Sequence, residues 1–323
     1  MKAVIADHYG GPEVLEIKQV DKPFPKSNEV LIQIKATSVT AASTFLRAGK
    51  PYFGRLFTGP LKPKVKTLGT DLSGIIEAVG PDVTSFKPGD QVMAVTGIKG
   101  GTYAEYICLP EDDLLSLKPE NISAAEATGI LDGACTALAF FTDQVEIKAG
   151  MSVLINGASG SIGTAAIQLA KYFGAEVTGV CSTKNKAMVK DLGVDKVLDY
   201  TKNELEKSTE QFDLIFDTVG TLSYSSAKKY LSENGLFLTP VLRLSALLNM
   251  MLISPFTKKK LKFAATGLRK PEQRKRDLLK VRDLLESGQL STVIDRVYSF
   301  SQIQDAHSYV DSGRKRGNVI LLF

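Results

Sequence analysis

The chain has 323 residues, of which 44% are hydrophobic and 23% are charged, and its formal net charge is +5. This length suits two domains, and the balance is typical of a soluble globular protein rather than a disordered or fibrous one. We find no run of ~18 apolar residues and no basic start followed by an apolar segment, so we expect neither a membrane span nor a secretory signal. Three isolated cysteines argue against a disulfide framework or zinc knuckle and fit a reducing cytoplasm: Cys108, Cys135 and Cys181.

Residues 1–122 predict a β-rich domain with many loops. The segments EVLIQIKAT (29–37) and DLSGIIEAVG (71–80) are short runs rich in Val and Ile, and turn residues such as KPGDQV (87–92) follow them. Prolines recur between residues 12 and 119. Such a pattern suits a barrel-like domain better than a helical one.

The pattern changes at Ser123, which we expect to cap a helix because Glu126 completes a capping box three residues later. Helical stretches then alternate with apolar strands, which predicts a parallel sheet covered on both faces. The expected strands are SVLIN (152–156), EVTGVC (176–181), KVLDY (196–200), DLIFDTV (213–219) and GLFLTP (235–240).

A charged helix over residues 271–288 leads to two short strands, DRVYSF (295–300) and GNVILLF (317–323). We interpret these last strands as the return of the chain to the first domain. The predicted domains are therefore 1–122, a β-rich catalytic domain, 123–268, a nucleotide-binding domain, and 269–323, the returning segment.

The loop INGASGSIG (155–163) lies between a strand and a helix, and this context favours a dinucleotide-binding loop. Gly160 lets backbone N–H groups approach a diphosphate, and Gly163 lets the helix pack closely on the strand. Ala158 stands where the pattern G-x-G-x-x-G begins with glycine, and it is tolerable if its φ stays negative. A structural turn without a ligand is the alternative. The candidate cofactor residues here are Ala158, Gly160, Ser161, Ile162 and Gly163.

The second strand of this unit ends in VCSTKNK (180–186), which contains no carboxylate. An NAD site usually places Asp or Glu there to bind the ribose hydroxyls, whereas a hydroxyl and an ammonium would bind a 2′-phosphate. We therefore predict NADPH as the cofactor, bound by Ser182 and Lys184. The alternative is a helix-capping Ser182 with surface lysines at positions 184 and 186.

The whole chain resembles the zinc-independent quinone oxidoreductase branch of the medium-chain dehydrogenase/reductase superfamily, typified by zeta-crystallin. This resemblance implies an α/β protein with a GroES-like β-barrel catalytic domain and a Rossmann cofactor domain with a doubly wound parallel sheet. Members of this branch commonly begin the phosphate loop with alanine. The matching segments include MKAVIADHYGGPEVLEI, LGTDLSGIIEAVGPDVTSFKPGDQVMA, GGTYAEYICLP, AGMSVLINGASGSIGTAAIQLAKYFGAEVTGVCSTKNK and SFSQIQDAHSYVDSGRKRGNVILLF.

The resemblance also implies site residues. The early loop of the family reads N-P-x-D-x-Y-x-R-x-G, and this chain has Thr40 at the Asn position and Phe45 at the Tyr position. Tyr52 is the best remaining phenol, so we predict Thr40, Phe45 and Tyr52 on the substrate side, with the substrate between the two domains. Further cofactor-binding positions implied by the family are Thr136, Tyr200 and Asn318.

Zinc-dependent members carry a GHE motif, where this chain has Gly69-Thr70-Asp71, and their early-loop cysteine is also missing. The two histidines, His8 and His307, lie near opposite ends of the chain, and we expect His307 to pack in a helix. We therefore predict no metal. Reduction of a quinone or an α,β-unsaturated carbonyl by hydride transfer needs only hydrogen-bond donors to the developing enolate.

The sequence thus predicts an NADPH-dependent reductase of quinones or α,β-unsaturated carbonyls, and several alternatives to this function remain open. The protein could be an enoyl-thioester reductase, an enzyme like the alcohol dehydrogenases, or a weakly catalytic NADPH sensor that binds RNA through the basic residues of 258–276. We favour a solvated face for that basic stretch and do not expect nucleic acid to be a partner. The apolar stretch 242–256 is interpreted as a cover for the cleft or a homodimer contact rather than a membrane-touching helix.

Overall fold

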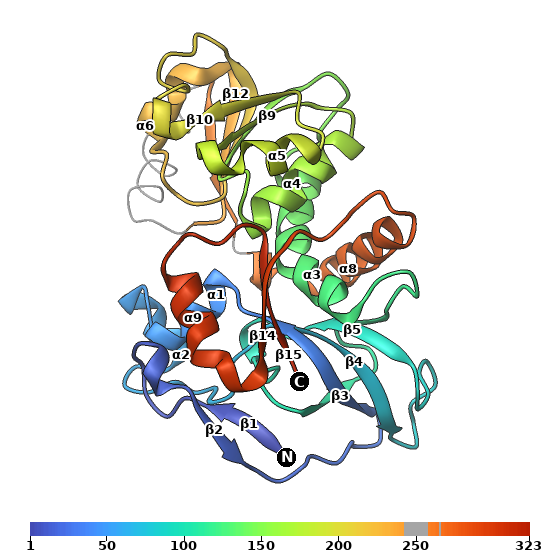
Figure 1. The fold of residues 1–323 in the computed structure, drawn as a ribbon. Helices are drawn as coiled ribbons and strands as arrows, with labels where there is room; N and C mark the ends of the chain where they lie inside the picture. Colours follow the sequence, from blue (N-terminus) through green and yellow to red (C-terminus); the bar gives the residue numbers. More distant parts are fainter. Residues whose placement is uncertain (242–257, 265) are drawn as a thin grey trace. The chain divides into compact units, whose positions relative to one another are not determined.

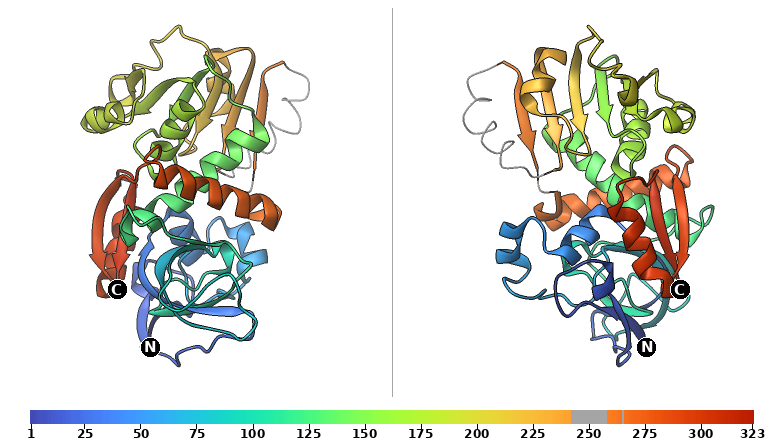
Figure 2. Two further views of the ribbon diagram at one scale, coloured as in Figure 1. Left: turned by 90° about the vertical axis from the view of Figure 1, so that its right-hand side faces the viewer. Right: turned by 60° about the vertical axis from the view of Figure 1, so that its left-hand side comes forward.

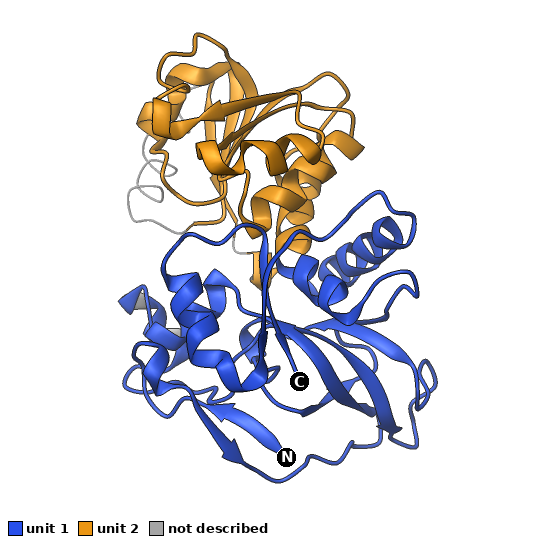
Figure 3. Cartoon of the chain, viewed as in Figure 1, with its two compact units in different colours: residues 1–132, 270–323 blue, residues 133–269 orange. Residues whose placement is uncertain are grey.

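The computed structural model describes residues 1–241, 258–264 and 266–323 (Figure 1). The chain forms two compact units, which Figure 3 distinguishes by colour: unit 1 comprises Met1–Asp132 and Lys270–Phe323, and unit 2 comprises Gly133–Arg269. The apolar stretch 242–256 lies outside the described residues.

Unit 1 is built on a seven-stranded sheet in the order β14-β15-β3-β4-β5-β7, with β6 paired to β3 (Figures 1 and 2). The last strand of the chain, β15, pairs antiparallel with β3, so the C-terminal segment returns to the first unit. The sheet strands are β3 (Glu29–Ser38), β4 (Asp71–Val79), β5 (Gln91–Val95), β6 (Tyr106–Pro110), β7 (Leu115–Leu117), β14 (Ile294–Ser299) and β15 (Asn318–Leu322), and β1 (Lys2–Ile5) pairs with β2 (Glu16–Gln19) in a separate ribbon.

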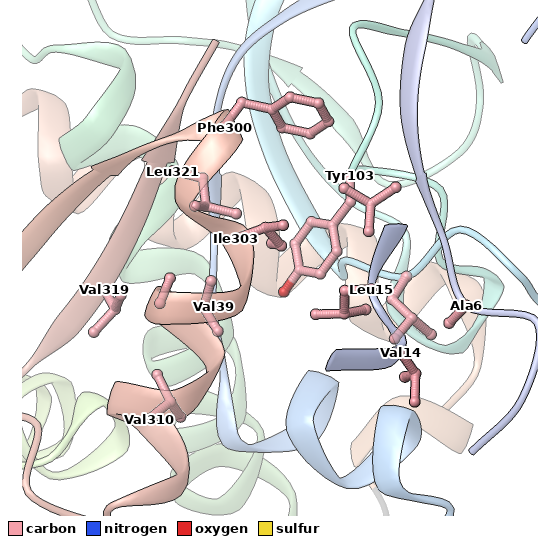
Figure 4. Packing of buried hydrophobic residues seen from close by; sticks show 13 residues of the cluster. Ala6, Val14, Leu15, Val39, Tyr103, Phe300, Ile303, Val310, Val319 and Leu321 are labelled. Carbon is pink, nitrogen blue, oxygen red and sulfur yellow. The ribbon is translucent and has the colours of Figure 1, made fainter. Parts of the chain in front are cut away.

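The helices of unit 1 include α1 (Ala41–Ala48), α2 (Arg55–Thr58), α8 (Pro271–Glu286) and α9 (Ile303–Asp311). Figure 4 shows how α9 packs by its apolar side against buried residues from distant parts of the chain. Tyr103 lies in this cluster and is fully buried. Its other members include Val14, Leu15, Val39, Ile303, Val310, Val319 and Leu321.

Unit 2 contains a six-stranded sheet in the order β10-β9-β8-β11-β12-β13, and every pairing in it is parallel. This confirms the predicted Rossmann architecture. The strands are β8 (Ser152–Asn156), β9 (Glu176–Cys181), β10 (Lys196–Asp199), β11 (Phe212–Asp217), β12 (Leu231–Thr239) and β13 (Lys260–Phe263), and the helices that follow strands are α4 (Ser161–Tyr172), α5 (Lys186–Asp191) and α6 (Tyr224–Ala227).

Helix α3 (Ala124–Ala139) begins as predicted: the Glu126 backbone N–H donates to Ser123 Oγ, and the Ser123 N–H donates to the Glu126 carboxylate. The two compact units divide inside this helix, and its first half bonds to another segment of unit 1: Thr292 Oγ1 donates to the Glu126 carbonyl at 2.7 Å. With the π-helical turn that follows, α3 has the length and composition of a membrane span, but 67% of its most apolar window is buried.

The basic run at 258–262 leads into strand β13, and although Lys258, Lys260 and Lys262 are exposed, some of its side chains also bind the protein. Lys259 Nζ donates to the carbonyls of Lys228 and Leu231, and Lys262 Nζ donates to the carbonyl of Gln144. Farther along, Arg269 forms an ion pair with Asp143 at 2.6 Å. Lys259, Lys262 and Arg269 therefore hold the segment around β13 to other parts of unit 2.

Candidate functional site

The phosphate loop of unit 2 turns at Gly157, one residue earlier than the sequence pattern suggests. Gly157 has φ +79°, in the left-handed region that favours glycine. Asn203 is the only non-glycine residue with positive φ in the described part of the chain, so Ala158 meets the condition set for it above. The Ala158 side chain is fully buried, and its backbone N–H donates to the Val180 carbonyl of β9. The alanine therefore belongs to the packing of the loop.

The two remaining glycines of the motif differ in what a side chain would meet. A Cβ added at Gly163 would lie 2.1 Å from the Gly157 carbonyl oxygen, so α4 needs glycine to pack against the loop. A Cβ at Gly160 would have only one neighbour within 4 Å, the same oxygen at 3.4 Å, which is ordinary contact. Gly160 also has extended backbone angles that any residue adopts. The protein itself therefore does not require glycine at 160, whereas a ligand that approaches the start of α4 would.

The turn after β9 leaves two polar groups without a protein partner. Ser182 occupies the N-cap position of the 3₁₀ turn Thr183–Asn185, but its side chain makes no capping hydrogen bond. Among the described residues, neither the Ser182 hydroxyl nor the Lys184 ammonium has a hydrogen-bond or ion-pair partner, while Lys186 pairs with Glu204 at 3.6 Å. The alternative of a capping Ser182 is thus disfavoured.

Asp199, at the end of β10, braces this turn and was not singled out from the sequence. Thr183 Oγ1 donates to the Asp199 carboxylate, and the Thr201 N–H and hydroxyl donate to the same group. These hydrogen bonds, first that of Thr183, hold the pKa of Asp199 below its usual value. Tyr200 follows directly and is exposed, so its ring is accessible to a ligand.

Thr136 lies in α3 near the start of α4. Gly133, one helical turn before it, approaches α4 so closely that a Cβ would lie 2.5 Å from the Ser161 carbonyl oxygen. Residues three apart share a helix face, so Thr136 lies on the side of α3 that carries this contact. Ser161 is buried and Ile162 is half-buried at the first turn of α4. The structure thus brings the predicted residues of the phosphate loop and α3 together in unit 2.

Asp217, at the end of β11, is a second carboxylate at the carboxyl end of a strand of this sheet, and it too was not singled out from the sequence. It accepts hydrogen bonds from Asn156 Nδ2 at 2.8 Å and from the backbone N–H groups of Gly220 and Leu222. Burial raises its pKa, and the hydrogen bond from Asn156 opposes that shift. Asp217 therefore fixes the loop that follows β11, beside the phosphate loop. Its position after an apolar strand was the sequence signal.

In unit 1 the predicted Thr40 is the N-cap of α1. Its Oγ1 accepts from the Ser43 N–H at 3.0 Å, and Ser43 Oγ in turn accepts from the Thr40 N–H, which forms a capping box. Tyr103 donates its hydroxyl to Ser43 Oγ at 3.0 Å and to the Ser38 carbonyl at 3.2 Å. The proton of the Thr40 hydroxyl has only a long contact, 3.4 Å to Ser43 Oγ.

The other predicted residues of unit 1 have different environments. Phe45 and Tyr52 are 54% and 69% exposed, and the Arg55 guanidinium lies 4.9 Å from the Tyr52 ring centre. Asn318 is buried in β15, and its amide donates to the Val293 carbonyl at 3.1 Å. The aromatic pair is therefore available to a ligand, whereas the Asn318 side chain already has a role in the protein.

Asp71, at the position of the missing GHE glutamate, is a fully buried carboxylate. It accepts from the Ser38 N–H at 2.9 Å, from Ser38 Oγ at 2.7 Å and from Thr128 Oγ1 at 2.9 Å. Burial raises the pKa of Asp71 to about 6, against the effect of these hydrogen bonds. In the described part of the chain, no three His, Cys, Asp or Glu side chains are grouped as a metal site.

His307 is fully buried in α9, as expected of a packing residue. Arg47 Nη1 contacts His307 Nδ1 at 3.2 Å, and Arg47 Nη2 pairs with Asp311 at 2.6 Å. Burial lowers the pKa of His307 to about 3, with the positive charge of Arg47 adding to the effect. This cluster ties α1, which Thr40 caps, to α9.

Known proteins resemble the chain along nearly its full length. The model of the alcohol dehydrogenase GroES-like domain matches residues 26–119, and that of zinc-binding dehydrogenases matches residues 192–321. A chloroplastic quinone oxidoreductase of Triphysaria versicolor is 33% identical over 99% of this chain and 98% of its own length. A chloroplastic NADPH-dependent alkenal/one oxidoreductase of Arabidopsis thaliana is 30% identical over 99% of this chain and 79% of its own length. The structure of the quinone oxidoreductase from Coxiella burnetii matches with a TM-score of 0.86 and 26% identity, over 100% of this chain and 99% of that one.

Proposed function

The chain belongs to the medium-chain dehydrogenase/reductase superfamily, as its motifs predicted, and we propose that it is an NADPH-dependent oxidoreductase that reduces quinones or α,β-unsaturated carbonyls. The names of its relatives support this activity. The observation in the chain itself that carries the proposal is Gly160, whose glycine identity neither the backbone angles nor the surrounding protein atoms require.

The residues of unit 2 fit NADPH. The first N–H groups of an α-helix have no partner within the helix, so those at the start of α4, which Gly160 precedes, would hold the diphosphate. Ser182 and Lys184 would hold the 2′-phosphate, because their polar groups have no protein partner and no unpaired carboxylate lies in the turn. Thr136 and Tyr200 would contact the nicotinamide and adenosine parts. When bound, NADPH supplies the hydride.

On the substrate side, we propose that Thr40 donates its hydroxyl proton in a hydrogen bond to the developing enolate oxygen. The capping box fixes the oxygen of Thr40 while leaving its proton with only a long contact. Phe45 and Tyr52 supply aromatic surface on which a quinone or enone can stack. Hydride adds to the electron-poor carbon, negative charge develops on the conjugated oxygen, and water supplies the proton that completes the reduction.

We also propose that this reaction uses no zinc, although one matching family model is that of zinc-binding dehydrogenases. Thr70 and Asp71 replace the His-Glu pair of zinc members, and the Asp71 carboxylate is already occupied by donors from Ser38 and Thr128. We expect purified protein to hold no stoichiometric zinc and to keep its activity in EDTA. About one zinc per chain, with activity lost on chelation, would contradict this.

The basic segment 258–276 gives little support to the hypothesis of an RNA-binding protein, because several of its side chains bind carbonyls and carboxylates within unit 2. A small molecule is the partner that we propose. The homodimer and the cytoplasmic location predicted from the sequence stay predictions, and two of the relatives above are named chloroplastic.

The decisive experiment follows NADPH oxidation by the purified protein against quinones, enones, alkenals, enoyl thioesters and simple alcohols or ketones. We expect turnover of a quinone or enone that is faster with NADPH than with NADH. Turnover confined to enoyl thioesters, or to the alcohol and ketone pair, would replace the proposed substrate class. No turnover of any compound, together with tight NADPH binding, would favour a sensor.

A further inference from the structure

We call the phosphate loop (155–163) and the turn after β9 (182–185) the cofactor edge of unit 2. One side chain, Asn185, joins these two parts, which are separate in the sequence. Its Nδ2 donates to Ser159 Oγ at 2.9 Å, across 26 residues. Asn185 is the last residue of the 3₁₀ turn that begins after Ser182, and Ser159 directly precedes Gly160 in the phosphate loop. One amide therefore connects the turn that would recognise the 2′-phosphate to the loop that would hold the diphosphate.

The direction of this hydrogen bond determines where the Ser159 proton points. Ser159 Oγ accepts from Asn185, so its own O–H is directed elsewhere, and the described residues offer it no acceptor. Ser159 is half-buried, which leaves this proton accessible. The Asn185 Oδ1 atom is buried and has no hydrogen-bond partner, so the amide acts in the described protein only as a donor. An uncommitted hydroxyl proton beside Gly160 suits a phosphate oxygen.

The same turn is held from its other side by Asp199. Thr183 donates to the Asp199 carboxylate, and the Asp199 N–H donates to Glu204, which also pairs with Lys186. Thr183 and Asn185 are thus both anchored, while Ser182 and Lys184, which alternate with them, are not. This alternation leaves the two unanchored side chains for the ligand.

We propose that Asn185 is a positioning residue that couples recognition of the 2′-phosphate to the phosphate loop. It holds Ser159 so that the Ser159 proton faces the diphosphate, and it holds the turn so that Ser182 and Lys184 face the 2′-phosphate. The inference rests on the proposed use of NADPH. It predicts that loss of one hydrogen bond between two protein groups lowers the preference for NADPH over NADH.

A double-mutant cycle tests the coupling, with dissociation constants for NADPH and NADH measured by calorimetry. We expect Asn185→Ala and Ser159→Ala each to weaken NADPH binding about five-fold, the effect of one hydrogen bond. The double variant should bind little more weakly than either single one, because both changes remove the same interaction. Both single variants should also lower the ratio of NADPH to NADH affinity, because each removes the hydrogen bond that links the 2′-phosphate turn to the phosphate loop.

The variant Asn185→Asp tests the direction of the bond, and it also serves if Asn185→Ala fails to fold. The carboxylate would accept the Ser159 proton and add negative charge near the 2′-phosphate turn, so NADPH should lose more affinity than NADH. Asn234→Asp, at an exposed position of β12, adds the same charge as a matched control and should change neither constant.

Two results would overturn the inference, and they are distinguishable. Additive effects in the cycle, with both cofactors weakened equally and a lower Tm, would mean that Asn185 merely supports the fold. A wild-type protein that binds NADPH and NADH with equal affinity would overturn the proposed cofactor and the coupling with it.

Discussion

The cofactor edge of unit 2 leaves polar groups without a protein partner, whereas the predicted substrate-side hydroxyl of unit 1, that of Thr40, helps to build the protein. Ser182 and Lys184 have no partner in the described chain. In unit 1, Thr40 caps helix α1. A group with no protein partner breaks no hydrogen bond within the protein when it binds a ligand. We infer that the 2′-phosphate is recognised by side chains reserved for it, whereas Thr40 would bind the substrate in addition to its structural role.

A substitution in the phosphate loop should give the largest change in NADPH affinity, and it tests this comparison directly. Gly160→Ala should leave the Tm near its wild-type value, because the new Cβ meets only one atom, at 3.4 Å. It should nevertheless weaken NADPH binding about a hundred-fold, close to 3 kcal/mol, because the methyl group would fill the space beside the diphosphate. Calorimetry and thermal unfolding of the same samples measure both quantities.

Gly163→Ala is the matched variant for this test. Its Cβ would lie 2.1 Å from the Gly157 carbonyl oxygen, so it should lower the Tm as well as the affinity. If Gly160→Ala bound NADPH as well as the wild type does, the space beside Gly160 would not be a diphosphate site.

Local sequence signals were sufficient to predict the architecture of unit 2. Its strands are continuous apolar runs that end at turns, and parallel pairing follows when helices separate such runs. The start of α3 was equally predictable, since the Ser123 and Glu126 contacts span three residues. The contact of Thr292 with the Glu126 carbonyl was not, because it joins residues that lie 166 positions apart in the sequence.

The residues that position the site were harder to predict, because they act over long sequence separations. Asn185 reaches Ser159 across 26 residues, and Asp217 reaches Asn156 across 61. Tyr103 meets Ser43 across 60 residues. A hydroxyl or carboxylate that follows a strand can be noticed in a sequence, but the partner that it chooses depends on the tertiary fold.

A second test concerns the interior of unit 1, where His307 is held neutral. Its pKa in the folded protein is about 3, below the value of 6.5 for a free side chain. Between these values the unfolded chain binds a proton that the folded one does not, so stability is present above pH 6.5 and is lost as the pH falls toward 3. The contribution to the free energy of unfolding should fall by roughly 1 kcal/mol per pH unit.

The variant His307→Gln cannot take up this proton, so its free energy of unfolding should depend less on pH over the same window. His8→Gln removes the other histidine, which is exposed, and should keep the wild-type dependence. Urea unfolding at several pH values measures the slopes. Identical slopes for the wild type and His307→Gln would show that His307 is not buried in its neutral form.

Lys184 and Lys186 give a smaller but more direct contrast at the cofactor edge. Lys184→Ala should weaken NADPH binding by about 1–3 kcal/mol, the range for a lost charge-assisted contact, and should leave NADH binding unchanged. Lys186→Ala should have little effect on either, because Lys186 pairs with Glu204. We expect wild-type protein to prefer NADPH by at least about ten-fold, which corresponds to one such contact. A larger loss with Lys186→Ala than with Lys184→Ala would reverse the assignment.

The smallest effect is expected at Thr40, where the structural and proposed catalytic roles of one hydroxyl can be separated. Thr40→Val removes both the helix cap and the proposed donor, so it should lower the free energy of unfolding by about 1 kcal/mol and kcat/KM about ten-fold. Thr40→Ser keeps both and should restore them, whereas Thr40→Asn keeps the cap and offers an amide donor in place of the hydroxyl. Phe45→Ala should act mainly on KM, by removing the stacking surface, and Tyr52→Phe should have an effect no larger than that of Thr40→Val.

The double variant Thr40→Val, Tyr52→Phe decides how the product is protonated. Residual turnover above background supports protonation by water, because neither hydroxyl is then an obligatory acid. Complete loss in a protein that still folds and binds NADPH would mean that one of the two hydroxyls supplies the proton. Loss of stability in Thr40→Val without any change in kcat/KM would mean that the Thr40 hydroxyl serves only as a helix cap and takes no part in the reaction.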